Sequence, residues 1–353
     1  MSPWTGEAAH LADRIVAYVD AALADMAEPE PFGDLALAIH RWQRAHDPVL
    51  AALTEHDPTE WTDIPSVPVG LFKDLPVGTV PPERAAITFR TSGTTGAGRG
   101  EHRLRSPVLY ERGALGFAKK VLTPLQPLTG RVVALLGDPR ATPDSSLSHM
   151  VSLFPAFSGD GTSSWYVHDG VLNREGLDAA IRAATGPVFV ASTAFALAEW
   201  LDHDVPRLPS GSWLMVTGGF KGRRVRLDDA GLYAEAAARL VPGRIVTEYG
   251  MTELSSQLWG IPGESFRAPR WLRVVAVDPH LGTPLPAETP GQLRFYDLCN
   301  LDGTLAIETL DEGVVHADGT VTLHGRLAGA EARGCSLTIE EAWERRRALD
   351  ARG

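Results

Sequence analysis

Short apolar runs alternate with helical patterns along most of the chain. Four such runs, each bounded by Gly, Pro or polar residues, are Val132 to Leu136, Val188 to Ala191, Leu214 to Val216 and Ile245 to Thr247. Runs of this kind are typical of buried strands, and their alternation with helices predicts an α/β fold with helices covering a largely parallel sheet. Near the start, apolar residues recur at helical spacing over residues 8–26, which predicts an amphipathic helix.

The pattern changes beyond Pro269. Apolar runs become closely spaced, with turn residues between them, at Leu272 to Val277, Gln292 to Tyr296, Leu305 to Thr309, Val314 to His316 and Thr320 to His324. Such spacing predicts a smaller, mostly antiparallel β section. We therefore expect an α/β domain over residues 1–268, and a small β-rich section with a short tail over residues 269–353. The proline-rich stretch 63–82 is predicted to be an irregular connection.

Composition narrows the class of protein. The chain has 353 residues, of which 44% are hydrophobic, and a formal net charge of −11, so it is expected to be globular and not to bind nucleic acid. No signal peptide or membrane-spanning stretch is apparent, which predicts a cytoplasmic protein with no membrane partner. The only cysteines are Cys299 and Cys335, too few for a disulfide framework.

A glycine-rich segment, TFRTSGTTGAGRG, covers residues 88–100. Glycines allow backbone N–H groups to converge on an anion, and hydroxyls add donors, so a polyphosphate cradle is one interpretation; a flexible loop is the other. The spacing nearly matches the Walker A motif. However, Arg99 and Gly100 stand where that motif needs Lys and Ser or Thr, which argues against a P-loop NTPase.

Within that segment, Ser92-Gly93-Thr94-Thr95-Gly96 resembles the phosphate loop of the adenylate-forming superfamily, which includes acyl-CoA synthetases and adenylation domains. The segment Thr247 to Glu253, directly after an apolar run, resembles the Tyr-Gly-x-Thr-Glu motif of the same superfamily. An aromatic ring can stack on adenine, a hydroxyl can hold the α-phosphate, and a carboxylate can bind Mg²⁺. The resemblance gives these roles to Tyr249 with Gly250, to Thr252 and to Glu253.

Three further motifs extend the resemblance. Gly218-Gly219 follows the run that ends at Val216, where the superfamily places adenine; a tight turn is the alternative interpretation. Asp311 resembles the aspartate that binds the ribose hydroxyls, and Gly325-Arg326 resembles the pair that leads into the C-terminal lid. The resemblance implies ATP and Mg²⁺ as cofactors.

A narrower resemblance, to acyl-protein synthetases of the LuxE type, covers nearly the whole chain. It is carried by Pro68 to Lys73, Asp144 to Ser148, Asp297 to Asp302 and Gly329 to Ser336. Those enzymes form a fatty acyl-adenylate, move the acyl group to their own cysteine and pass it to a reductase. The resemblance implies that Cys335, near Arg333 and Arg326, is that cysteine, because a thiolate attacks an acyl-adenylate readily. Cys299 is expected to be structural.

The sequence departs from the superfamily pattern in three features. Ala97-Gly98-Arg99 replaces the usual Pro-Lys after the phosphate loop, a full-length lid is expected to be absent, and no lysine follows Lys221. A cation normally offsets the charge that builds up during adenylation. Lys221, beside the Gly218-Gly219 pair, is the first candidate for this catalytic cation, and the others are Arg99, Arg103 and Lys73.

The expected activity is the ATP-dependent conversion of a fatty or aryl carboxylic acid to an acyl-adenylate, with release of pyrophosphate and transfer of the acyl group to a thiol, Cys335 first. Two alternatives remain open at this point. In the first, the acceptor is an external amine, coenzyme A, a carrier-protein thiol or another acceptor protein, and Cys335 is inert. In the second, the chain is a non-catalytic nucleotide-binding protein.

Overall fold

The computed structural model describes residues 3–91, 98–124, 130–158, 161–218 and 229–327. The chain forms two compact units, which we call unit 1 (Met1–Gly113, Met251–Ser256 and Ala268–Gly353) and unit 2 (Ala114–Gly250 and Gln257–Arg267). One passage between them, after Arg267, lies next to the predicted boundary at residue 268. That boundary as a division between functional domains stays a prediction.

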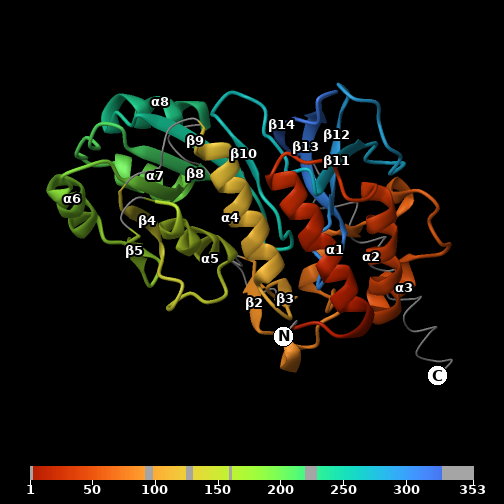
Figure 1. Ribbon diagram of the computed structural model, residues 1–353. Helices are drawn as coiled ribbons and strands as arrows, with labels where there is room; N and C mark the ends of the chain where they lie inside the picture. Colours follow the sequence, from red (N-terminus) through yellow and green to blue (C-terminus); the bar gives the residue numbers. More distant parts are fainter. Residues whose placement is uncertain (1–2, 92–97, 125–129, 159–160, 219–228, 328–353) are drawn as a thin grey trace. The chain divides into compact units, whose positions relative to one another are not determined.

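Unit 2 contains a seven-stranded sheet with the strand order β10-β9-β8-β7-β4-β5-β6. Its interior strands are parallel, and the edge strands β10 and β6 pair antiparallel with their neighbours. The four predicted runs are confirmed as strands of this sheet (Figure 1). The strands are β4 (Val132–Gly137), β5 (Ser163–His168), β6 (Val171–Leu172), β7 (Phe189–Thr193), β8 (Trp213–Thr217), β9 (Arg244–Tyr249) and β10 (Leu258–Gly260).

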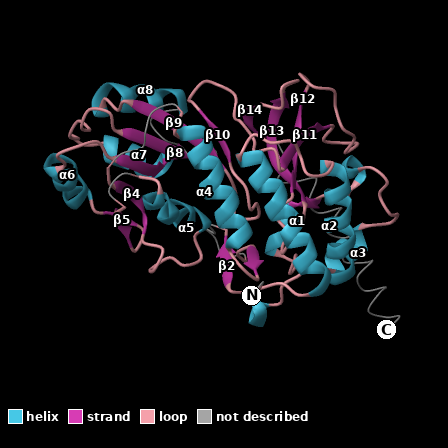
Figure 2. Cartoon of the chain, in the orientation of Figure 1, coloured by secondary structure: helices cyan, strands magenta, loops and turns pink. Residues whose placement is uncertain are grey.

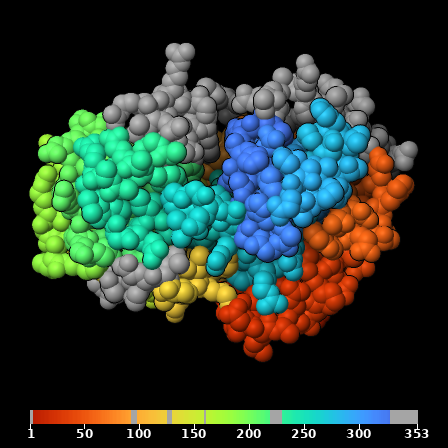
Figure 3. Space-filling model, turned by 90° about the horizontal axis from the view of Figure 1, so that it is seen from above, coloured from red at the N-terminus to blue at the C-terminus, as the bar shows by residue number. Residues whose placement is uncertain are grey.

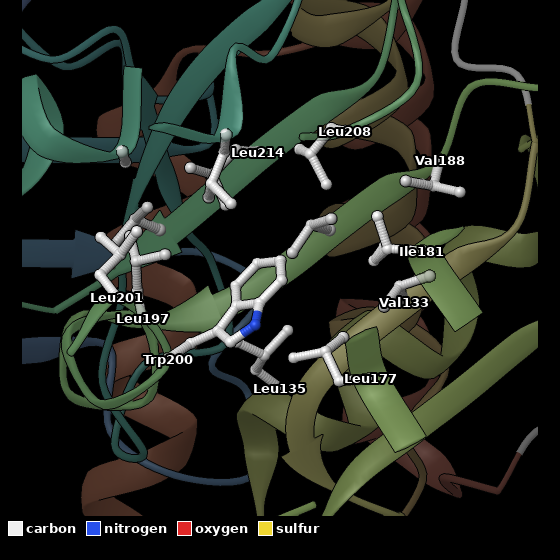
Figure 4. Close-up of a cluster of buried hydrophobic side chains, with 14 of the residues drawn as sticks. Val133, Leu135, Leu177, Ile181, Val188, Leu197, Trp200, Leu201, Leu208 and Leu214 are labelled. Carbon is white, nitrogen blue, oxygen red and sulfur yellow. The ribbon is translucent and has the colours of Figure 1, made fainter. Parts of the chain in front are cut away.

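Helices cover this sheet and close an apolar core. Side chains of α6, α7 and α8 pack against strand residues such as Val133, Val190 and Leu214, and Figure 4 shows the Trp200 ring among them. The Trp200 indole N–H donates to Asp178 Oδ1 at 2.9 Å, which satisfies its polar atom and joins α7 to α6. The helices are α4 (Val108–Leu122), which begins in unit 1, α5 (Ser146–Leu153), α6 (Arg174–Ala183), α7 (Ala194–Leu201) and α8 (Asp229–Leu240).

Unit 1 contains a five-stranded sheet with the order β1-β13-β12-β11 and β14 beside β13. All its pairs are antiparallel except β1 with β13, which confirms the predicted antiparallel β section. Its strands are β1 (Val67–Pro68), β11 (Leu272–Val277), β12 (Pro290–Asp297), β13 (Ala306–Val315) and β14 (Val321–Arg326).

The prediction of separate strands at 305–309 and 314–316 was wrong, because both runs belong to β13. Polar residues Asp311 and Glu312 interrupt the apolar pattern between them, yet they stay in the strand. The register with β14 shifts between Glu312 and Gly313, and a Cβ on Gly313 would lie 2.4 Å from the Thr322 carbonyl oxygen. An irregular, glycine-dependent pairing therefore carries the strand through its polar stretch.

The N-terminal helices of unit 1 pack on this sheet (Figure 2). The Phe32 ring of α2 lies 5.3 Å from Trp61, whose ring lies 4.9 Å from Tyr296 of β12. The first helix ends at Leu23, close to the predicted end. The remaining elements are α1 (Gly6–Leu23), α2 (Phe32–His46), α3 (Pro48–Leu53), the 3₁₀ helices Trp61–Asp63, Val69–Lys73 and Pro82–Arg84, and the hairpin β2 (Ile87–Arg90) with β3 (Glu101–Leu104). Among the described helices, none has the length and apolar character to cross a bilayer.

We expect Leu197→Ala to lower the free energy of unfolding of unit 2 by about 2–5 kcal/mol, because Leu197 is fully buried in the core and its loss leaves a cavity. Urea unfolding followed by tryptophan fluorescence measures this. Val171→Ala is the control, since Val171 is 66% exposed and its truncation should change stability by less than about 0.5 kcal/mol. Equal effects of the two substitutions would contradict the proposed core.

Candidate active site

Two predicted nucleotide motifs lie at the carboxyl ends of adjacent parallel strands in unit 2. Thr217 of β8 pairs with Glu248 of β9, so Gly218 and Tyr249 directly follow residues that share one register level. Gly218 is exposed and has a φ of 69°, a conformation that glycine adopts at little cost. Ligands of open α/β sheets bind at this edge. The structure thus brings Gly218 and Tyr249 to the same sheet edge, whereas Gly219 and Lys221 lie outside the described residues.

Tyr249 is half-buried, and its ring lies 6.3 Å from that of Phe266 in an edge-to-face arrangement. The following residue, Gly250, is exposed and tightly placed. A Cβ at position 250 would lie 2.5 Å from Glu248 Oε1 and 3.3 Å from Gln257 Cγ. The glycine of the Tyr-Gly pair therefore leaves room for a neighbouring carboxyl group.

That carboxyl group belongs to Glu248, a residue to which sequence reasoning gave no role. Glu248 is 5% exposed, and the Thr217 hydroxyl donates to its Oε2. Burial raises the pKa of Glu248 to about 7, although the bond from Thr217 acts in the opposite direction. The sequence signal that was available is an acidic residue inside the β9 strand, one position before the Tyr-Gly pair.

The Thr-Glu half of the motif belongs to unit 1. Thr252 is half-buried and Glu253 is 4% exposed. Their backbone carbonyls accept hydrogen bonds from His102 Nδ1 at 2.8 Å and from Asn300 Nδ2 at 2.9 Å. No group of three or more His, Cys, Asp or Glu side chains within the described ranges is arranged to hold a metal ion. A Mg²⁺ ion bound mainly through substrate phosphates needs only one or two protein carboxylates. Glu253 as such a ligand stays a prediction.

The predicted phosphate loop connects the two strands of the β2–β3 hairpin. Its residues Ser92, Gly93, Thr94, Thr95 and Gly96 lie outside the described residues, but the hairpin ends on either side are defined. Thr91 N donates to Gly100 O at 3.0 Å, and Gly100 N donates to Thr91 Oγ1 at 2.9 Å. A Cβ on Gly100 would lie 3.1 Å from Phe72 Cβ, so this glycine allows the hairpin to pack against the 3₁₀ helix Val69–Lys73.

Asp311 and Arg326 face each other across β13 and β14, an adjacency that sequence reasoning did not predict. Arg326 Nε lies 3.8 Å from Asp311 Oδ1, and their side chains are 52% and 24% exposed. The two strands form part of the molecular surface in Figure 3. A partly exposed pair of this kind contributes little to stability.

The structure describes one of the two cysteines. Cys335 lies outside the described residues. Cys299 is buried, and burial raises the pKa of its thiol well above the usual range, which fits the structural role predicted for it.

Two of the candidate cations bind backbone carbonyls. Arg103 is 9% exposed and donates to Val80 O at 3.1 Å, while Arg99 Nε donates to Thr91 O at 2.6 Å.

Comparison of the sequence with models of known protein families and with curated proteins found no match. Solved structures with a similar fold include a CoA ligase. An open conformation of 2-hydroxyisobutyryl-CoA ligase in complex with 2-HIB-AMP and CoA has a TM-score of 0.63 at 11% identity, over 84% of this chain and 75% of that chain. The chain has the fold of the adenylate-forming ligases. At such identity the likeness establishes the fold alone.

Two other solved structures resemble a smaller share of the chain. The ATP-bound RpMatB-BxBclM chimera B3 has a TM-score of 0.50 at 17% identity, over 70% of this chain and 49% of that chain. ATP-bound MatB from Rhodopseudomonas palustris gives 0.49 at 17% identity with the same coverage. The chain therefore spans about half the length of these two proteins.

Glu248→Gln should stabilise the protein more at pH 8 than at pH 4. A folded-state pKa of about 7, above the ordinary 4.5, means that stability present below pH 4.5 is lost as the pH rises through 7. The neutral amide keeps an acceptor for Thr217 and does not titrate, so the difference between variant and wild type should grow by up to about 3 kcal/mol. Urea unfolding at several pH values measures it. Thr217→Val is the control: it keeps the carboxyl group, so its stability should follow the wild-type pH trend. If the stability difference between Glu248→Gln and wild type does not change with pH, Glu248 does not ionise in its buried position.

Proposed function

We propose that the protein activates a carboxylic acid with MgATP and transfers the acyl group to a thiol. A carboxylate oxygen attacks the α-phosphorus, the bond to the β-phosphate breaks and pyrophosphate leaves. A thiolate then attacks the acyl carbon, and AMP leaves with the bonding electron pair. The observation that supports this most is the Tyr249 to Glu253 segment: it starts at the carboxyl end of a parallel strand, and it ends in a threonine and a buried carboxylate whose backbone is fixed.

The roles of the motif residues follow the chemistry of their side chains. Tyr249 stacks on adenine beside Gly218 and Gly219, and the Thr252 hydroxyl binds the α-phosphate. Glu253 holds Mg²⁺, which supplies charge neutralisation for the polyphosphate. The loop residues Ser92, Gly93, Thr94, Thr95 and Gly96 bind the β- and γ-phosphates through backbone N–H groups and hydroxyls. Asp311 binds the ribose hydroxyls and Arg326 lies beside it, while Lys221 offsets the charge of the transition state.

The substrate class we propose is a fatty or aryl acid, and the acceptor is Cys335 in the manner of the LuxE-type synthetases. One observation favours a second acceptor. The 2-hydroxyisobutyryl-CoA ligase that shares this fold was solved with an acyl-adenylate and CoA, so transfer to external coenzyme A is the competing function. In that case Cys335 takes no part in the reaction.

Glu253→Gln is expected to slow acid-dependent ATP–pyrophosphate exchange at least 100-fold, or about 2.7 kcal/mol, because it removes the carboxylate that binds Mg²⁺. Exchange with labelled pyrophosphate across a panel of fatty, aryl and amino acids measures this. Glu264→Gln, an exposed carboxylate in the 261–267 stretch, is the matched control and should keep full activity. Unchanged exchange in Glu253→Gln, or no exchange in the wild type with any acid, would contradict adenylation.

Cys335→Ser should retain pyrophosphate exchange within about twofold but lose the hydroxylamine-labile acyl adduct, because the thiol serves only the second half-reaction. Intact-mass measurement after incubation with MgATP and acid detects the adduct. Cys299→Ala is the control and should keep both activities, since that thiol is buried and protonated. An adduct that survives in Cys335→Ser would exclude Cys335 as the acceptor. Acylation of added CoA without any adduct would show that the acceptor is external.

A further inference from the structure

Buried polar side chains surround residues 252–256 in unit 1, which we call the Thr–Glu segment. It forms neither a helix nor a strand, so its backbone groups need partners from elsewhere. Three side chains supply them: His102 from β3, and Asp297 and Asn300 from the end of β12 and the loop after it. All three are at most 1% exposed.

His102 binds the first carbonyl of the segment. Since the Thr252 carbonyl can only accept, Nδ1 must carry the hydrogen over the 2.8 Å contact, which fixes the tautomer. Burial lowers the pKa of His102 to about 4, so the ring is neutral at pH 7. A Cβ on Gly303 would lie 2.9 Å from Nε2, so the opposite side of the ring packs tightly on the loop that follows Asn300.

Asn300 binds the next carbonyl and has no rotational freedom left. Its Nδ2 donates to Glu253 O at 2.9 Å and to Thr304 O at 2.8 Å, and its Oδ1 accepts from Ser255 Oγ at 3.3 Å. Its own backbone carbonyl accepts from Gln43 Nε2 of α2 at 2.8 Å. The amide is thus held from both sides, and a carboxylate at this position would face two carbonyl oxygens with no hydrogen to offer.

Asp297 fixes the far end of the segment. Its Oδ2 accepts from Ser255 N at 3.0 Å, and its Oδ1 accepts from Ser256 Oγ at 2.8 Å and from Cys299 N at 3.0 Å. A buried carboxylate is costly unless it is hydrogen-bonded in this way. Together, Asp297, His102 and Asn300 hold the backbone of the Thr–Glu segment in one conformation.

We propose that His102 and Asn300 are positioning residues of the activation reaction. By holding the backbone carbonyls of Thr252 and Glu253, they orient the Thr252 hydroxyl toward the α-phosphate and the Glu253 carboxylate toward Mg²⁺. This inference rests on the proposed function. Both side chains are at most 1% exposed, so we give neither a direct contact with substrate. Groups of this kind matter because a displacement of about 1 Å in a reacting site costs on the order of 100-fold in rate.

The test compares paired substitutions at each position. His102→Asn places an amide nitrogen where Nδ1 lies and keeps the donor, whereas His102→Gln places it near Nε2 and loses the bond to Thr252. Asn300→Asp keeps the shape and removes the donor. Trp4→Phe is the control, because it removes a buried 2.8 Å hydrogen bond to Asp302 in the same loop as Asn300, while the bonds of His102 and Asn300 to the Thr–Glu segment keep both partners.

We expect His102→Gln and Asn300→Asp to lower kcat/KM for MgATP in pyrophosphate exchange at least tenfold, with KM for the acid changed less than twofold. His102→Asn should stay within threefold of wild type, and Trp4→Phe should lower Tm while keeping kcat/KM. Wild-type kcat/KM in His102→Gln, no recovery in His102→Asn, or an equal loss in Trp4→Phe would overturn the positioning role.

The His102 pair decides alone if Asn300→Asp does not fold. Failure of the proposed function looks different, because the wild type itself would then show no exchange with any acid. That outcome would overturn this inference along with the proposed function.

Discussion

A buried backbone that leaves regular secondary structure must find a partner for each N–H and C=O group, and this constraint shapes the centre of unit 1. In the Thr–Glu segment, Leu254 N donates to Met251 O at 3.2 Å, and side chains supply the bonds at Thr252, Glu253 and Ser255. Those side chains come from parts of the chain far apart in sequence. The segment can therefore adopt its path only when β3, β12 and the loop after β12 are all in place.

A second constraint acts in unit 2, where the parallel pairing of β8 with β9 sets Thr217 opposite Glu248. That register allows the Thr217 hydroxyl to meet the buried carboxyl group, and a Cβ on residue 250 would lie 2.5 Å from Glu248 Oε1, so a larger residue there would require this carboxyl group to shift. Packing against Glu248 thus restricts which residue can follow Tyr249, in addition to any restriction that a ligand imposes. A glycine in a nucleotide motif can have a structural reason that the motif alone does not reveal.

Sequence reasoning predicted the strands well where the apolar runs are short and bounded, as in β8 and β9, because burial on both faces of a sheet demands such runs. It could not predict that α1 to α3 fold with the C-terminal sheet. That association depends on contacts such as those of Gln43 with the 300–305 loop, more than 250 residues away, and periodicity carries no information about partners at that distance. Glu248 and His102 were missed for a similar reason, since their importance lies in burial and in partners remote along the chain.

The structure narrows the choice of cation for the proposed adenylation, which the sequence leaves open. Arg103 is buried and its guanidinium binds the Val80 carbonyl, so moving it to a ligand would leave that carbonyl unpaired and cost about 1–3 kcal/mol. Arg99 is exposed but binds the carbonyls of Thr91 and Arg90, at one end of the hairpin that carries the predicted phosphate loop. Each of these arginines holds backbone that a mobile catalytic group would have to release. Of the four candidates for the catalytic cation, the two arginines are therefore less suitable than the two lysines. Lys221, which follows Gly218-Gly219 in sequence, stays the first prediction.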